Sequence, residues 1–233
     1  MKRGPPAPRV PRVVLLDLDG TLVDSAPDLA LAANAALAAV GHSPVSECDV
    51  RRRVGNGARV LVARCLAGAD DARPAPGSVL DRAMEVFLDH YARHVCVGSV
   101  VYPGVREGLR ALRALDLRLA CVTNKPGAHA EALLRALDLR EPFDLVLGGD
   151  AVTRGKPDPE PVRTALARLE AAPDEAIMVG DSRNDVLAAR AAGVAVVCVS
   201  YGYNHGGDIR DARPDAVIDS LEALPRLLRP ADR

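Results

Sequence analysis

Two carboxylates stand where a short apolar run ends near the start of the chain. Residues 13–18 are VVLLDL, and Asp17 and Asp19 belong to the following motif, DLDGT. Burying a carboxylate without a partner is strongly unfavourable, so this pair requires a cation, hydrogen bonds or solvent at the mouth of a cleft. The alternative interpretation is a pair of solvated turn residues.

Three further polar clusters favour the cleft, because each also follows an apolar run typical of a strand. They are Thr123-Asn124-Lys125, Lys156 within GKPDPEP, and Asp181 with Asp185 within GDSRND. In open α/β sheets the ligand crevice lies outside the carboxyl ends of the strands. Four separate segments therefore predict one common site.

The residue types in these clusters suit a metal ion and an anion together. Three or four carboxylates can hold a hard divalent cation, and a hydroxyl, an amide and an ammonium can surround an anion such as phosphate. Asp181 and Asp185 are four residues apart, so a helix starting beside them could place both side chains on one side of its first turn. One of the two would then bind metal while the other supports Lys156 or a ligand.

The elements that position these clusters alternate along the chain. Six short apolar runs predict strands at 13–18, 119–123, 145–149, 176–181, 195–200 and 216–219. Between them, apolar residues recur with helical spacing over 105–112, 130–137 and 162–169. This alternation predicts an α/β fold, a doubly wound parallel sheet with helices on both faces.

The interval from 23 to 100 breaks the alternation, since it contains no comparable strand pattern. Ser25 and Asp28 fit a capping box for a helix that ends near Gly41, and apolar spacing over 79–91 predicts another helix. We therefore predict a flexible N-terminal tail at 1–11, an α/β core at 12–22 and 101–229, and an inserted small all-helical domain at 23–100.

Composition excludes several classes of function. The 233 residues carry 30 Lys+Arg and 31 Asp+Glu, and a net charge of -1 provides no field to hold nucleic acid. No apolar run approaches the roughly 20 residues that span a bilayer, so we expect no membrane partner and a cytoplasmic protein. Five cysteines without a C-x-x-C pair are expected to be reduced. The oligomeric state cannot be predicted from this sequence.

Taken together, the four motifs resemble those of the haloacid-dehalogenase-like hydrolase superfamily. The matching segments are DLDGT at 17–21, VTN at 122–124, Lys156 in GKPDP, and GDSRND at 180–185. The resemblance spans nearly the whole chain and implies a Rossmann-like core, with residues 23–100 as the family's helical cap. Within the superfamily, DLDGTLVDSAPDL, VTNKP and SYGYNHG are most similar to bacterial phosphoglycolate phosphatases.

The resemblance implies a role for each motif residue. Asp17 would be the nucleophile that forms an aspartyl-phosphate, and the Asp19 side chain would be the general acid and base. Mg²⁺ would be the cofactor, with the Asp17 carboxylate, the Asp19 main-chain carbonyl and the Asp181 carboxylate as its ligands. The remaining expected contacts are phosphoryl binding by Thr123, Asn124 and Lys156, and support of the metal or lysine by Asp185.

The implied reaction is Mg²⁺-dependent hydrolysis of a small phosphate monoester, 2-phosphoglycolate, to glycolate and phosphate. A cap loop at Gly55, Asn56 and Gly57 would close over this small-molecule substrate. Two enzymatic alternatives stay open: a phosphatase for another small organic phosphate, and a phosphomutase of the same fold. A phospho-accepting signalling module is the non-enzymatic alternative. The helical insert argues against such a module, and so does Asp19, a base that would speed loss of the phosphoryl group.

Three other features have two interpretations each. His90 and His94 could share a metal, but Tyr91 stands where a zinc-protease motif would need Glu, so a surface pair is favoured. The run Arg51–Arg53 could bind a substrate carboxylate, but a solvated face is the favoured interpretation. The segment 201–206 is either the rim of the site or a Gly-rich connection.

Overall fold

The computed structural model describes residues 11–73 and 77–228. The flexible tail predicted for 1–11 lies, apart from Pro11, outside the described residues, and so does residue 229 at the predicted end of the core. Within the described part of the chain, no helix is both long and apolar enough to cross a membrane.

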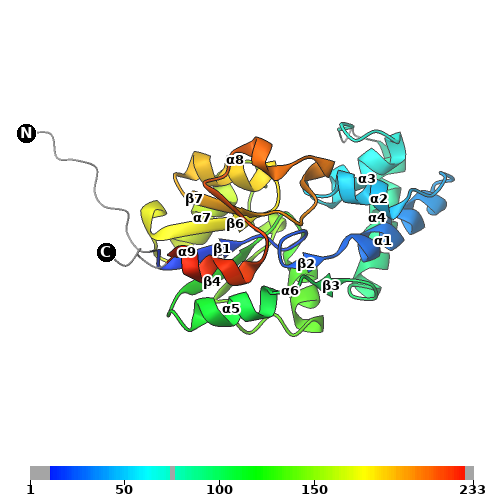
Figure 1. The fold of residues 1–233 in the computed structure, drawn as a ribbon. Helices are drawn as coiled ribbons and strands as arrows, with labels where there is room; N and C mark the ends of the chain where they lie inside the picture. The colour runs from blue at the N-terminus through cyan, green and yellow to red at the C-terminus, as the bar shows by residue number, and fades with distance from the viewer. Residues whose placement is uncertain (1–10, 74–76, 229–233) are drawn as a thin grey trace, which may run out of the picture.

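The six predicted strands form one parallel sheet, which confirms the doubly wound α/β fold (Figure 1). Its order is β5-β4-β1-β6-β7-β8, with β1 between β4 and β6, so the first motif lies inside the sheet. Leu16, the last residue of β1, pairs with Cys121 on β4 and Val179 on β6. The strands are β1 (Val13–Leu16), β4 (Arg118–Val122), β5 (Leu145–Leu147), β6 (Ala176–Gly180), β7 (Ala195–Val199) and β8 (Ala216–Ile218).

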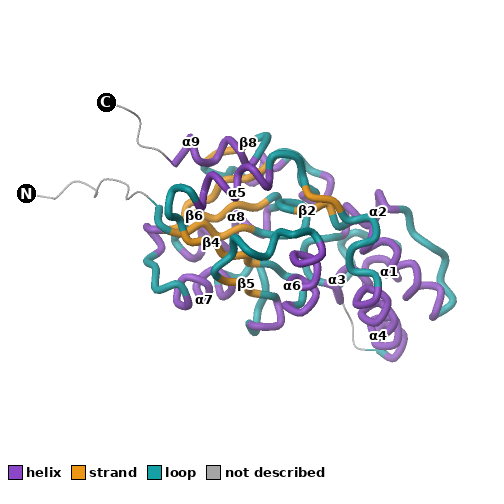
Figure 2. Tube along the Cα trace, turned by 90° about the horizontal axis from the view of Figure 1, so that it is seen from below, coloured by secondary structure: helices purple, strands orange, loops and turns teal. Residues whose placement is uncertain are grey.

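Both faces of this sheet are covered by helices, which explains why its strands are continuously apolar (Figure 2). Val14 and Leu16 pack into the cluster beneath α5 (Val105–Arg113), α6 (Gly127–Ala136) and α9 (Leu224–Leu228). Val13 and Leu15 face the opposite cluster, beneath α7 (Glu160–Arg168) and α8 (Arg183–Ala192). Short 3-10 turns complete the core at Gly149–Ala151, Pro173–Glu175, Asn204–Gly206, Ile209–Ala212 and Leu221–Ala223.

A second group of helices, called here the helical unit, lies beyond the carboxyl ends of the strands (Figure 1). It consists of α1 (Ala26–Ala39), α2 (Glu47–Arg53), α3 (Ala58–Ala67) and α4 (Ser78–Arg93). These helices bury a cluster of their own, in which Leu37, Val62 and Phe87 are almost fully enclosed. The domain limits at 23 and 100 stay a prediction.

Two short strands connect the helical unit to the sheet, and the sequence pattern did not indicate them. β2 (Val23–Asp24) and β3 (Val100–Val101) pair antiparallel, with Val23 opposite Val101. Each strand has two residues, which is too short to produce the period-2 pattern from which strands are recognised.

The predicted capping box at the start of α1 is wrong. Ser25 is the N-cap residue, but its side chain makes no capping hydrogen bond; its hydroxyl donates to Asp19 instead. The Asp28 carboxylate accepts hydrogen bonds from the backbone N–H groups of Val97, Gly98 and Ser99. A buried carboxylate is stabilised by several donors, and the segment that returns from α4 supplies three of them, so Asp28 joins distant parts of the chain.

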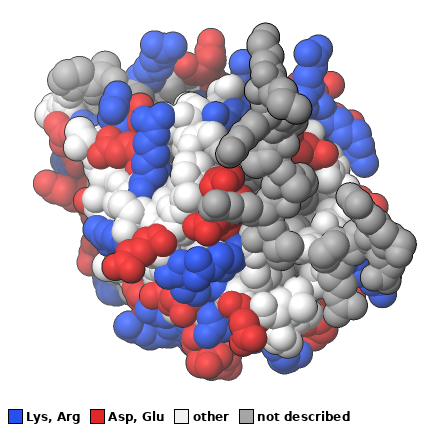
Figure 3. All heavy atoms as spheres, turned by 90° about the vertical axis from the view of Figure 1, so that its left-hand side faces the viewer, with Lys and Arg blue, Asp and Glu red and all other residues white. Residues whose placement is uncertain are grey.

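Charge is mixed on the face turned away from the helical unit. Figure 3 shows Lys and Arg side chains interspersed with Asp and Glu there, in keeping with the balanced composition. All five cysteines are free thiols in the structure.

Candidate active site

The structure brings the four polar motifs together at the carboxyl ends of the central strands. Asp17 directly follows β1, and its backbone N–H donates to the Val179 carbonyl of β6 over 2.9 Å. Thr123 directly follows β4, and Asp181 directly follows β6. Neighbouring parallel strands end at the same edge, and this explains why residues more than 150 positions apart in the sequence meet here.

Lys156 lies at the centre of the polar cluster and is 3% exposed. Its ammonium donates to the Val122 carbonyl at 2.8 Å and to Asp185 Oδ1 at 2.7 Å, and it forms an ion pair with Asp17 Oδ1 at 2.8 Å. These three oxygens match the three N–H donors of an ammonium. Lys156 therefore fixes the position of the Asp17 carboxylate.

Asp185 is fully buried and acts as a support for this lysine. Besides Lys156, its carboxylate accepts from the Ser182 backbone N–H at 3.1 Å and from the Ser182 hydroxyl at 2.8 Å. Asp185 is the third residue of α8, whereas Asp181 precedes the N-cap Ser182 and lies outside the helix. The expectation that both carboxylates share the first helical turn is therefore wrong for Asp181.

Three carboxylates in this cluster form a candidate cation site. Oxygens of Asp17, Asp181 and Asp185 lie within 4.8 Å of one another. Burial, together with the neighbouring carboxylates, raises the pKa of Asp17 to about 7 and that of Asp181 to about 8, although Lys156 opposes the shift. One ammonium does not neutralise three buried carboxylates, and a donor set made only of oxygen suits Mg²⁺. These residues therefore fit the expected ion.

Asp19 points to a different partner from the other carboxylates. Its oxygens accept from the Lys125 ammonium at 2.9 and 3.1 Å, and Oδ1 also accepts from the Ser25 hydroxyl. Lys125 is buried, and the predicted set of site residues omitted it. The sequence did contain a signal for Lys125, because it directly follows the predicted site residues Thr123 and Asn124. A lysine buried at such a position needs an acidic partner.

Thr123 and Asn124 differ in whether their side chains still have a hydrogen-bond donor available for a ligand. Thr123 Oγ1 accepts from the Lys125 backbone N–H at 3.1 Å, and its hydroxyl proton can still be donated. The Asn124 amide donates to the carbonyls of Gly55 at 2.9 Å and Lys156 at 2.8 Å, and its oxygen accepts from the Lys156 N–H. Its side chain is therefore committed to joining loops, which does not fit the expected phosphoryl contact.

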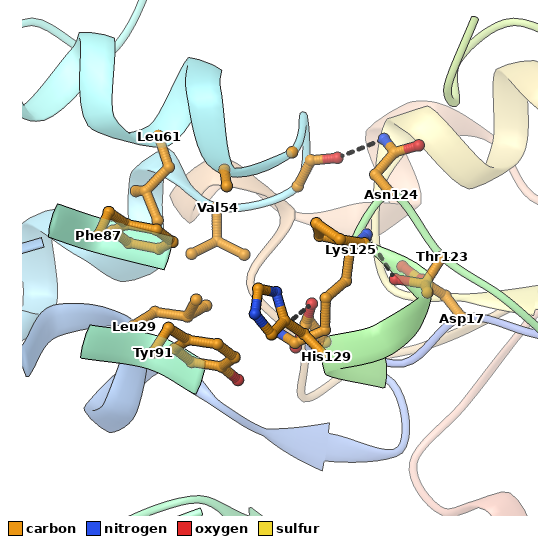
Figure 4. Close-up of a pocket in the computed structure, with 15 residues that line it drawn as sticks. Asp17, Leu29, Val54, Leu61, Phe87, Tyr91, Thr123, Asn124, Lys125 and His129 are labelled. Atoms are coloured by element: carbon orange, nitrogen blue, oxygen red, sulfur yellow. Dashed lines mark hydrogen bonds and ion pairs between the residues drawn. The ribbon is translucent and has the colours of Figure 1, made fainter. Parts of the chain in front are cut away.

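A cavity of about 520 Å³, including its open mouth, separates the polar cluster from the helical unit (Figure 4). One wall carries Asp17, Asp19, Thr123, Asn124 and Lys125, and the opposite wall is mostly apolar, with Leu29, Val54, Leu61, Phe87 and Tyr91. Of the predicted cap loop, Gly55 and Gly57 line this cavity, and Asn56 is not among the lining residues. The Gly55 carbonyl accepts from Asn124 and Asn184, and these bonds hold the loop against the core.

The segment 201–206 lies against the site and is not a simple connection. The Tyr203 backbone N–H donates to Asp181 Oδ2 at 2.7 Å. The Tyr203 hydroxyl accepts from the N–H groups of Ser25 and Ala26 at 2.9 and 3.0 Å and donates to Asp24 at 2.8 Å. At Gly202 a Cβ atom would lie 2.1 Å from the Asp181 side chain, so only glycine fits there.

The favoured interpretation of the arginine run as a solvated face is wrong for Arg53, whereas the side chains of Arg51 and Arg52 are 34% and 38% exposed. Arg53 is 5% exposed and pairs with Asp70 over 2.7 Å, and Arg51 pairs with Asp24 over 2.8 Å. These arginines hold α2 in place because acidic groups of other segments face them. His90, on α4, and His94, the residue that caps its C-terminus, have ring centroids 4.4 Å apart, and neither lines the cavity.

Three kinds of comparison with known proteins agree. Residues 11–193 match the family model described as haloacid dehalogenase-like hydrolase. A phosphoglycolate phosphatase of Nitrosospira multiformis is 45% identical over 94% of this chain and 96% of its own length, and one of Nitrosococcus oceani is 42% identical over 95% and 98%. The crystal structure of a predicted phosphoglycolate phosphatase from Haemophilus somnus superposes with a TM-score of 0.88 at 36% identity, covering 95% of this chain and 99% of that one.

Proposed function

This chain belongs to the haloacid dehalogenase-like hydrolase family, and from that premise we propose that it is a Mg²⁺-dependent phosphatase that converts 2-phosphoglycolate to glycolate and phosphate. The enzyme class, a phosphoric monoester hydrolase, follows from the family and from relatives that are 42–45% identical. The observation that carries the finer proposal is the cluster of Asp17, Asp181 and Asp185 around Lys156, from which Asp17 reaches the lining of the adjacent cavity.

Asp17 is the nucleophile in this proposal. Its carboxylate oxygen forms a bond to phosphorus while the ester oxygen leaves, which gives an aspartyl-phosphate and an alkoxide. Lys156 holds the carboxylate in place by its 2.8 Å ion pair, so the attacking group does not have to be ordered during the reaction. The bound Mg²⁺ would be held by the Asp17 carboxylate, the Asp19 carbonyl and the Asp181 carboxylate, and it would neutralise charge between nucleophile and phosphate.

Asp19 moves the proton in both steps of the reaction. Its protonated carboxyl donates to the leaving alkoxide, and the carboxylate then takes a proton from the water that attacks the aspartyl-phosphate. Lys125 and Ser25 hold the side chain, so it is kept from turning toward the carboxylate cluster.

The other cavity residues bind the phosphoryl group and keep out water. Thr123, which lines the cavity, has a hydroxyl proton to donate to the phosphoryl group. Lys156 does not line the cavity and its three donors are taken by Val122, Asp185 and Asp17, so it contributes positive charge behind Asp17 and no free donor. The helical unit serves as the cap in this proposal, because its apolar wall of Leu29, Leu61 and Phe87 encloses the reacting groups.

Phosphate release from a panel of esters tests the substrate. The panel contains 2-phosphoglycolate, phosphoserine, glucose 6-phosphate and 4-nitrophenyl phosphate, each with Mg²⁺ and with EDTA. We expect the highest kcat/KM for 2-phosphoglycolate and loss of activity in EDTA. Equal turnover of all four esters would reject the named substrate and leave the hydrolase class standing.

Asp17→Asn tests the mechanism. The variant should keep its fold by circular dichroism, because an amide of the same shape replaces a carboxylate, and should lose nearly all turnover. Ordinary rates in the folded variant would reject Asp17 as the nucleophile.

Rapid turnover of radiolabelled phosphate on the wild-type protein is expected, whereas a label that persists for minutes would favour a signalling role.

A further inference from the structure

Tyr91 carries a polar group that the proposed mechanism leaves unused. The residue lies on α4, is 1% exposed and lines the cavity. The Lys125 ammonium lies beside its hydroxyl oxygen, but the hydroxyl proton has no acceptor among the described residues. The other buried side-chain atoms without a partner in this part of the chain belong to Arg53, Arg64 and His90. Of these four, only the tyrosine lines the cavity. An unsatisfied buried hydroxyl destabilises the protein, so its presence beside a cavity indicates a partner that arrives with the ligand.

Two nitrogen-bearing side chains surround the same ring (Figure 4). The Lys125 ammonium lies 4.6 Å from the ring centroid of Tyr91. The His129 ring, from α6, meets the tyrosine edge to face, with centroids 5.4 Å apart and planes at 83°. Tyr91, Lys125 and His129 all line the cavity, and they come from three different segments. Lys125 and His129 follow β4 of the sheet, and Tyr91 belongs to the helical unit.

Each of the three side chains has a proton to donate. Lys125 has three N–H donors: the two oxygens of Asp19 accept at most two of them, and the third faces Tyr91, where an incoming carboxylate can accept it. Burial raises the pKa of the Tyr91 hydroxyl, which therefore keeps its proton at neutral pH. Burial and the nearby Lys125 lower the pKa of His129, whose neutral ring still carries one N–H. An ammonium with two neutral donors suits a carboxylate better than a neutral group.

We propose that Tyr91, Lys125 and His129 bind the carboxylate of the substrate and thereby select 2-phosphoglycolate over esters that lack this group. The inference rests on the proposed function and extends it. In 2-phosphoglycolate a single methylene separates the ester oxygen from the carboxylate. The ester oxygen must reach Asp19 for proton transfer, and Lys125 contacts Asp19 directly. The carboxylate is thereby brought to the side of the cavity where these three donors lie.

Tyr91→Phe tests the proposal with two substrates that differ only at the recognised group. Ethyl phosphate replaces the carboxylate of 2-phosphoglycolate by a methyl group. We expect kcat/KM of the variant to fall roughly 10- to 100-fold for 2-phosphoglycolate, as for loss of a hydrogen bond to a charged group, and to stay unchanged for ethyl phosphate. The melting temperature of the free variant should be equal or higher, because the removed hydroxyl proton had no acceptor. His129→Gln should shift the ratio of the two substrates in the same direction.

His90→Gln is the matched control. His90 precedes Tyr91 on α4 and also has a buried polar atom without a partner, but it lies outside the cavity lining. This variant should leave the ratio of kcat/KM for the two substrates unchanged.

Two results would overturn the carboxylate site while the wild-type preference for 2-phosphoglycolate stands. One is an equal fall for both substrates in Tyr91→Phe, which would indicate a structural role. The other is a fall in kcat/KM of Tyr91→Phe for 2-hydroxyethyl phosphate that equals the fall for 2-phosphoglycolate, which would indicate a site for neutral groups. A wild-type enzyme that does not prefer 2-phosphoglycolate to ethyl phosphate would reject the named substrate itself and the carboxylate site with it.

Discussion

Replacing Lys156 by Met should strongly destabilise the metal-free protein. The substitution keeps the length of the side chain but removes the cation that faces Val122, Asp17 and Asp185 at 2.7 to 2.8 Å. Asp185 is 0% exposed, so its charge cannot be solvated by water once the ammonium is gone. Breaking a buried ion pair by removing one partner typically costs about 3–5 kcal/mol of unfolding free energy. We expect a value in the upper half of that range, because two carboxylates lose the same partner.

A double-mutant cycle with Asp185→Asn separates this effect from lost packing. Removing the second charge should restore part of the stability, with a coupling free energy of about 2 kcal/mol between positions 156 and 185. Urea unfolding of the four proteins in EDTA measures it. Arg113→Met is the control, since Arg113 and Asp144 also pair over 2.8 Å but are 44% and 33% exposed, and such pairs contribute below about 1 kcal/mol. Additive free energies in the cycle, or equal losses for Lys156→Met and Arg113→Met, would refute the reasoning.

Two further predictions concern the ion and the loop beside it. The raised pKa values of Asp17 and Asp181, about 7 and 8 against a usual 3.8, mean that the metal-free folded protein binds more protons than the unfolded chain. Its unfolding free energy should therefore fall as pH rises from 4 through 8. Mg²⁺ should raise the melting temperature more at pH 8 than at pH 6, because fewer protons then compete for the carboxylates. Equal shifts of the melting temperature at the two pH values would contradict this. Tyr203→Phe removes two hydrogen bonds that the hydroxyl accepts and one that it donates, and should lower the unfolding free energy in urea by about 1–3 kcal/mol; an unchanged value would show that these bonds contribute nothing.

The sequence was most informative where a residue type and a strand end coincide. The run before Asp17 is buried on both faces, so its apolar pattern is unbroken and the strand was predictable. Because parallel strands bring their carboxyl ends together, the meeting of Asp17, Thr123 and Asp181 also followed from position alone, whereas Lys156 reaches the cluster through a loop that continues beyond the end of β5 at Leu147. The resemblance to a known family then supplied roles, which spacing does not contain.

The parts that escaped prediction depend on contacts between segments that are distant in the sequence. Arg53 belongs to a charge run that looks solvated, and only the tertiary fold shows that it is buried against Asp70. Asp28 has the spacing of a capping residue, but the segment at 97–99 competes for it. Tyr91 carries no motif signal, because its relation to Lys125 exists only once the helical unit lies over the sheet.

The pairing of β2 with β3 limits how the molecule can open. Val23 precedes α1 and Val101 follows α4, and these two residues are partners in the same ladder. The strands β2 and β3 therefore cross between the sheet and the helical unit side by side, as one two-stranded ribbon. The helices α1–α4 are therefore tied to the sheet by a paired ribbon and not by two independent linkers, so the two connections are expected to move together.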